Sequence, residues 1–179
     1  LLSQAEHGAD SQVILVSTRQ DVIERIIDST SRQLQLLSRK DLALAALQNS
    51  KFILLHNEND LMDLINEYAP EHLILAVDDY MRLYDKVVNA GSVFLGHYSC
   101  ESAGDYASGT NHTLPTSGYA KAFSGVSLDS YIRKITFQEL SPQGVMSIGR
   151  AVEIMAHNEQ LTAHENAMAL RLDKILENK

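Results

Sequence analysis

A short apolar stretch near the start of the chain, QVILVS at residues 12–17, decides the expected fold. Its aliphatic and β-branched residues predict a buried strand. Similar strand-like runs follow at 51–56, 73–77 and 91–95, separated by helical stretches at about 18–37, 41–48, 58–68 and 78–89. Strands alternating with helices predict an α/β fold, with a mainly parallel, Rossmann-like sheet covered by helices.

The pattern changes near residue 138, from which the chain reads as helical to its end. We therefore expect an α/β domain over residues 1–137 and a helical C-terminal arm over residues 138–179. A break is expected near residues 158–161, because Thr162-Ala163-His164-Glu165 fits a capping box that begins a last helix. A separate arm is expected because its apolar face needs a partner outside the α/β part.

Composition limits the partners that the protein can have. The chain has 179 residues, which is enough for one core and a small appendage. Its formal net charge of -8 argues against nucleic acid or an anionic membrane as a partner. No apolar run approaches the length of a membrane span. A single cysteine excludes an internal disulfide and favours a reducing compartment such as the cytoplasm.

The segment GDYASGTNHTLPTSG, residues 104–118, is too long for a turn and too polar for a strand or a core helix. Polar loops of this length inside compact domains are usually functional. Asp105, Asn111 and His112 are its candidate functional residues. Asp105 follows a glycine and could ligate a metal; the alternative is an Asx-type turn that satisfies its own backbone.

Two further pairs of polar residues could take part in chemistry. Gln4 and His7 lie three residues apart on an expected helix, so they share a face and could bind zinc. Glu71 and His72 lie between a helix and a strand, where α/β proteins bind ligands at a sheet edge, and could supply two bases. The alternative for both pairs is ordinary solvated surface.

The arm carries the last candidates, Glu159 and His164. On one continuous helix they would lie about 140° apart, but the expected break between them relaxes this constraint. The alternative is a lone histidine on an amphipathic helix. Two histidines with oxygen donors suit Zn²⁺ or a similar ion, so the candidate residues could form a metal set.

Five stretches of the chain are similar to the C-terminal part of the histidinol dehydrogenase family. They occur in the family's order and approximate spacing, and they extend over nearly the whole chain. The stretches are LLSQAEHGADSQVIL (1–15), INEYAPEHLIL (65–75), NAGSVFLG (89–96), ESAGDYASGTNHTLPTSGYA (101–120) and EQLTAHENAMALR (159–171). The chain departs from the family pattern at Cys100, where proline is common, and at Gln160, where glycine is frequent.

The resemblance implies the last steps of histidine biosynthesis. It implies oxidation of L-histidinol to L-histidine through an aldehyde held on the enzyme, with two NAD⁺ and one zinc per site. The implied acid/base pair is Glu71 and His72, and the implied zinc ligands are Gln4, His7, Asp105 and His164. The implied substrate-binding residues are Gln4, His7, His72, Asp105, His112, Glu159 and His164.

The resemblance also implies a homodimer, in which Glu159 and His164 of the arm complete the partner's site. The compartment would be the cytoplasm, or the plastid in a plant. Members of the family are over twice as long, and most NAD contacts lie upstream of the stretches present here. We therefore expect this chain to be a fragment that does not turn over histidinol unaided. The alternatives are a non-catalytic zinc- or partner-binding remnant, and a zinc hydrolase in which Glu71 activates water.

Overall fold

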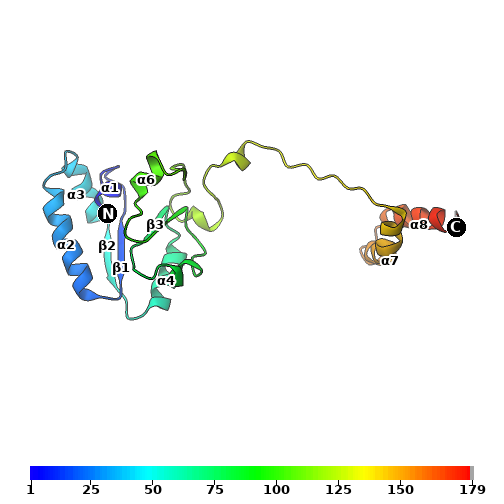
Figure 1. Ribbon diagram of the computed structural model, residues 1–179, viewed down its shortest axis with the longest axis horizontal. Helices are drawn as coiled ribbons and strands as arrows, with labels where there is room; N and C mark the ends of the chain where they lie inside the picture. The colour runs from blue at the N-terminus through cyan, green and yellow to red at the C-terminus, as the bar shows by residue number, and fades with distance from the viewer. Residues whose placement is uncertain (178–179) are drawn as a thin grey trace. The chain divides into compact units, whose positions relative to one another are not determined.

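A computed structural model describes residues 1–177 of the chain, which forms two compact units (Figure 1). The first unit, Leu1–Ile132, contains all the strands that the structure describes, and the second begins at Arg133. Within residues 1–177, no helix is long and apolar enough to cross a membrane.

The first part of the Leu1–Ile132 unit, here called the β1–β2 half, is built around two parallel strands. Its elements are α1 (Leu2–Ala5), β1 (Ile14–Ser17), α2 (Gln20–Leu34), α3 (Lys40–Gln48) and β2 (Lys51–Leu54). The strands pair in parallel, from Ile14 opposite Lys51 to Ser17 opposite Leu54. The core of this half contains three alanines, Ala5, Ala43 and Ala46, packed with Val13 and Leu34.

The expectation of a buried strand at residues 51–56 is wrong. Phe52 and Leu54 are 37% and 42% exposed, and β2 ends at Leu54. Alternate residues of a strand face the same side of the sheet, so Phe52 and Leu54 share an open face. A continuous apolar run is buried only where both faces of the sheet are covered, and in the described structure this face of β2 is not.

The second part of the unit, here called the β3–β4 half, follows the same parallel plan. Its elements are α4 (Glu58–Tyr68), β3 (His72–Leu75), α5 (Met81–Tyr84), β4 (Ser92–Leu95), α6 (Glu101–Tyr106) and the 3₁₀ turns Tyr119–Lys121 and Leu128–Ser130. β3 and β4 pair from His72 opposite Ser92 to Leu75 opposite Leu95. The helix expected over residues 78–89 shrinks to the single turn of α5.

The two faces of the β3–β4 pair have different roles. Leu73 and Leu75 point to one face and form a core with Met62 and Leu83, which come from α4 and α5. His72 and Phe94 lie on the opposite face, because side chains alternate along a strand and Phe94 is paired with Ile74, two residues after His72. The helices α4 and α5 therefore leave the His72 face available for other contacts.

The expected α/β fold with parallel strands and a helical C-terminal part is confirmed. The four described strands form two separate two-stranded sheets, and no described ladder joins β1–β2 to β3–β4. Contacts between side chains, and not a continuous sheet, therefore hold the two halves together.

The second unit is a helical hairpin made of α7 (Pro142–Asn158) and α8 (Thr162–Glu177). The expected break between them is confirmed, although Thr162 is the first residue of α8 and not its N-cap. The helical stretch expected from residue 138 begins only at Pro142, and residues 131–143 are all exposed.

The turn of the hairpin is a Schellman motif. The Gln160 amide donates to the His157 carbonyl at 2.9 Å, and the Leu161 amide donates to the Ala156 carbonyl at 2.9 Å. Gln160 has φ of 60°, in the left-handed region that favours glycine. The backbone therefore explains why glycine suits this position, where the chain carries glutamine.

Candidate functional site

His72 is the centre of the candidate site. It is the first residue of β3, and its side chain is only 9% exposed. The ring stacks at a tilt on Phe94, with 5.9 Å between ring centroids and an interplanar angle of 38°. His72 Nε2 is buried and has no hydrogen-bond partner in the described structure. An unpartnered buried ring nitrogen costs free energy, so this atom is a strong candidate for contact with a bound ligand.

Asp105 lies beside His72, on α6. Its Oδ1 is 3.9 Å from His72 Nε2, and the Asp105 side chain is 15% exposed. The neighbouring Gly104 explains how α6 reaches the sheet. A Cβ on Gly104 would lie 2.7 Å from Phe94 Cε1 and 2.6 Å from Thr110 Oγ1, so only glycine permits this approach. The absence of a side chain at Gly104 thus lets α6 pack closely on the face of the sheet that carries His72.

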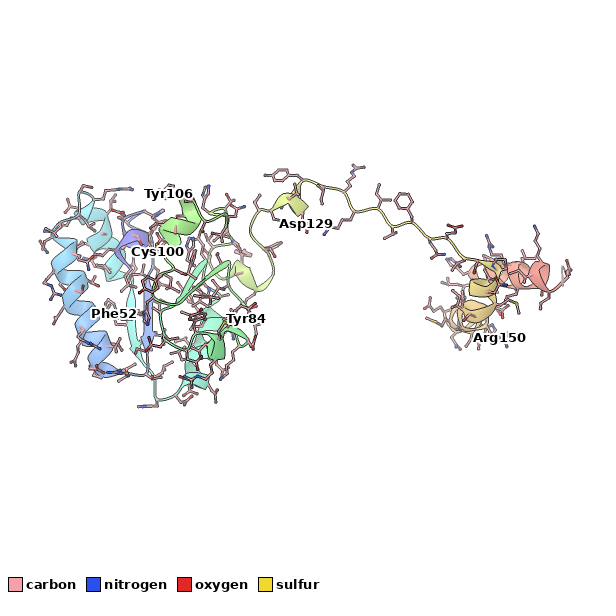
Figure 2. All side chains as sticks on the ribbon, in the orientation of Figure 1. Phe52, Tyr84, Cys100, Tyr106, Asp129 and Arg150 are labelled. Atoms are coloured by element: carbon pink, nitrogen blue, oxygen red, sulfur yellow. The ribbon has the colours of Figure 1, made fainter. Side chains whose placement is uncertain are left out.

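This arrangement corrects two expectations. Asp105 does not lie in a loop, because α6 extends to Tyr106 and the irregular segment begins at Ala107. His72 stands at the amino end of β3, whereas ligands of α/β proteins usually bind at the carboxyl ends of strands. The pair forms because α6 folds back over the sheet face. Cys100, which precedes α6, and Tyr106, its last residue, are labelled in Figure 2, and both are exposed.

Gln4 and His7 come from the start of the β1–β2 half. Gln4 lies in α1, and its Nε2 is buried without a hydrogen-bond partner in the described structure. His7 follows α1 in a turn and is exposed; its carbonyl accepts a hydrogen bond from Arg39 Nη2 at 3.2 Å. The expectation that both residues share a helix face is wrong, because α1 ends at Ala5 and His7 lies in the turn that follows.

The remaining candidates of the first unit are more open. Glu71 is half-buried, and its carbonyl accepts a hydrogen bond from the Ser92 amide at 2.9 Å. His112 is exposed in the segment after α6. The Asx-type turn considered for Asp105 occurs instead at Asn111, whose Oδ1 accepts a hydrogen bond from the Thr113 amide at 2.7 Å.

Glu159 and His164 belong to the second unit. Glu159 is the C-cap of α7, His164 lies in the first turn of α8, and both side chains are exposed. The left-handed residue Gln160 separates them, so the Schellman turn sets their spacing.

Three residues of the first unit, Gln4, His7 and Asp105, carry groups of the kind that bind a cation. A glutamine amide presents either its nitrogen or its oxygen after a half-turn, so the buried Gln4 position could offer an oxygen ligand. Asp105 adds a carboxylate beside the unpartnered His72 nitrogen. Within residues 1–177, no three His, Cys, Asp or Glu side chains form a metal cluster by themselves. Of the three zinc ligands expected in this unit, Gln4, His7 and Asp105, only His7 and Asp105 are among these four residue types.

A hydrogen bond joins two residues that sequence reasoning does not single out. Glu101 is buried in α6, and Ser3 Oγ donates to its Oε2 at 2.9 Å. They are 98 positions apart, so no local pattern relates them. The sequence carries only a weak sign of this pair: Ser3 lies in the family-like stretch 1–15 with Gln4, and Glu101 lies in the stretch 101–120 with Asp105.

Comparison with known proteins agrees with this architecture. The structure is similar to the crystal structure of histidinol dehydrogenase from Elizabethkingia anophelis, with a TM-score of 0.89 and 53% identity. That match covers 97% of this chain and 40% of the other. Histidinol dehydrogenases of Bacteroides fragilis and Campylobacter jejuni are 59% and 50% identical, each over 98% of this chain and 41% of the relative.

The fold defines the protein as an α/β protein with a helical C-terminal unit. The family profile described as histidinol dehydrogenase matches residues 1–172. The chain therefore belongs to the histidinol dehydrogenase family, and it spans a C-terminal part amounting to about 41% of the length of the relatives that it matches.

Proposed function

We propose that this chain carries the acid/base and zinc-binding part of an enzyme that oxidises L-histidinol to L-histidine with NAD⁺. Family membership supports the proposal at the level of the whole protein. The observation that supports it most directly is the buried, unpartnered His72 Nε2, 3.9 Å from Asp105 Oδ1.

His72 is suited to accept the proton of the substrate hydroxyl. For Nε2 to accept it, the neutral imidazole must carry its hydrogen on Nδ1. The side chain is 9% exposed, so few waters compete for that nitrogen. Asp105, with its carboxylate on the same side, would stabilise the imidazolium that forms. When bound, NAD⁺ would supply the hydride acceptor.

Glu71 is the proposed base for the second half of the reaction. It is adjacent to His72 and half-buried, which leaves its carboxylate accessible to water. Deprotonation of a water by this carboxylate would generate the nucleophile that adds to the aldehyde carbon. The proton removed from water moves to Glu71, and the two neighbouring bases thus act on different protons.

Zinc would be held by Gln4, His7, Asp105 and His164. When bound, the ion would hold the substrate in place and stabilise negative charge on ligand atoms. His7 and His164 must be neutral and Asp105 ionised to ligate it. The exposure of Glu159 and His164 within their own unit leaves them accessible to a site on a second copy, and we propose a homodimer of this kind.

The proposal is tested by joining this chain to the N-terminal part of the Bacteroides fragilis relative and measuring NADH and histidine. The expected result is two NADH per histidine, with histidinol-dependent activity lost by at least about 100-fold in His72→Ala, since a positioned base contributes this much. His97→Ala is the matched control, because His97 is an exposed histidine paired with Asp78. Histidinol turnover without NAD⁺ would favour the hydrolase, and zinc binding without any turnover would favour the non-catalytic alternative.

A further inference from the structure

Glu101 is buried in an unusual way for a charged residue. Among residues 1–177 it is the one charged side chain that is buried, at 4% exposure. Each carboxylate oxygen of Glu101 accepts a hydrogen bond from a serine hydroxyl. Ser3 Oγ donates to Oε2 at 2.9 Å, and Ser102 Oγ donates to Oε1 at 3.2 Å. A buried carboxylate is tolerated only when it is hydrogen-bonded in this way. The acid/base chemistry proposed above makes no use of it.

The Ser3–Glu101 bond joins two elements that carry proposed zinc ligands. Ser3 precedes Gln4 in α1, and Glu101 lies four residues before Asp105 in α6. Residues four apart on a helix share a face, so Glu101 and Asp105 project from the same side of α6. The bond therefore connects the helix of Gln4 to the helix of Asp105, beside the candidate site.

The same bond also crosses between the two halves of the first unit. α1 packs on the core of the β1–β2 half through Ala5, while α6 is fixed to β4 by the close approach of Gly104 to Phe94. No described strand ladder joins the two halves. Another hydrogen bond between them, from Tyr68 Oη to Gln12 Oε1 at 2.9 Å, is exposed. The Ser3–Glu101 hydrogen bond is part-buried, and its two residues lie on the helices of the proposed ligands Gln4 and Asp105.

We propose that Ser3 and Glu101 form a positioning pair that sets Gln4 on α1 against Asp105 on α6. This inference rests on the proposed zinc site. Glu101 acts through the two helices and does not contact the metal. Changing the Ser3 hydroxyl tests the pair without altering the charge of Glu101.

The test measures zinc affinity of the full chain by competition with a chelator. Ser3→Ala removes the donor to Glu101 Oε2 and is expected to lower zinc affinity by about 10- to 100-fold, as loss of supporting contacts around a metal commonly does. Ser3→Thr keeps a hydroxyl and should restore most of the affinity. Hydrogen exchange should rise in residues 1–7 of Ser3→Ala while the midpoint of thermal unfolding changes little.

Ser50→Ala is the matched control. Ser50 Oγ accepts from the Val13 amide and donates to the Ala46 carbonyl, so this change also removes a part-buried hydroxyl, but entirely inside the β1–β2 half. Zinc affinity of Ser50→Ala should equal that of the wild type. If Ser3→Ala does not fold, Ser3→Cys replaces it, because a thiol is a weak donor of similar size and should give an intermediate affinity.

The outcomes separate the two proposals. Equal zinc affinity in wild type and Ser3→Ala, or failure of Ser3→Thr to restore a lost affinity, overturns the positioning pair and leaves the zinc site standing. A wild-type chain that binds no zinc, alone or joined to the upstream part of a relative, overturns both. A loss in Ser50→Ala as large as in Ser3→Ala would show that the effect is general destabilisation, and would also overturn the pair.

Discussion

The two units hold their candidate residues by different means. In the first unit, large apolar side chains from separate elements, such as Met62 and Leu83, meet over a parallel strand pair. In the second, the buried residues of α7 are Val145, Gly149 and Ala156, and none of the described residues of α8 is buried. The first unit depends on contacts distant in sequence, whereas the second depends on a hairpin between neighbouring helices.

This difference decides how precisely each unit can place a side chain. His72 and Asp105 are mostly buried and lie 3.9 Å apart, although 33 positions separate them, because α6 packs onto the sheet. Glu159 and His164 are exposed, and a local turn alone sets their spacing. A buried pair is fixed by the packing of the whole unit, while the exposed pair requires another surface to fix it.

The largest effect is expected from a cavity in the first unit. Leu83→Ala removes a side chain that is 4% exposed, next to Met62 and Leu75, and should lower the free energy of unfolding by about 2–5 kcal/mol. Urea unfolding followed by circular dichroism measures this loss. Hydrogen exchange in residues 142–177 should remain as in wild type. Equal loosening of the hairpin would contradict the division of the chain into two compact units.

A smaller effect is expected where α6 meets the sheet. Gly104→Ala places a Cβ against Phe94 and Thr110, and overpacking of this kind costs about 1–3 kcal/mol. Because the clash displaces Asp105, zinc affinity should fall along with stability. Ala103→Ser is the control, since Ala103 is exposed on the same helix. If Gly104→Ala retained wild-type zinc affinity, the role of this close approach in placing Asp105 would be wrong.

The smallest effect is expected in the second unit and has the opposite sign. Gln160→Gly relieves a left-handed backbone and should stabilise the α7–α8 turn by a few tenths to about 1 kcal/mol. Slower hydrogen exchange in residues 155–165 would report the gain, with no change in residues 72–105. Asn158→Gly, at the helical end of α7, should instead loosen the turn. If hydrogen exchange changed in the same direction in both variants, the left-handed backbone at Gln160 would not explain the preference for glycine there.

Some expectations from sequence failed because tertiary contacts outweigh local preference. The length and polarity of residues 104–118 suggested a loop around Asp105, yet Gly104, Asp105 and Tyr106 belong to α6, where Gly104 packs closely on Phe94. The apolar run at β2 suggested burial, but Phe52 and Leu54 share an open face. In both cases the local pattern was sound, and the neighbouring elements decided the outcome.

The sequence by itself determined the parallel α/β order, the helical end, the break before Thr162 and the identity of the candidate residues. It could do so because apolar periodicity, turn residues and family motifs are local in the chain. Only the tertiary structure decided that His72 faces Asp105, that Gln4 Nε2 is buried without a partner, and that Ser3 bonds Glu101. These are relations between distant positions, and they arise from close packing, which no local pattern encodes.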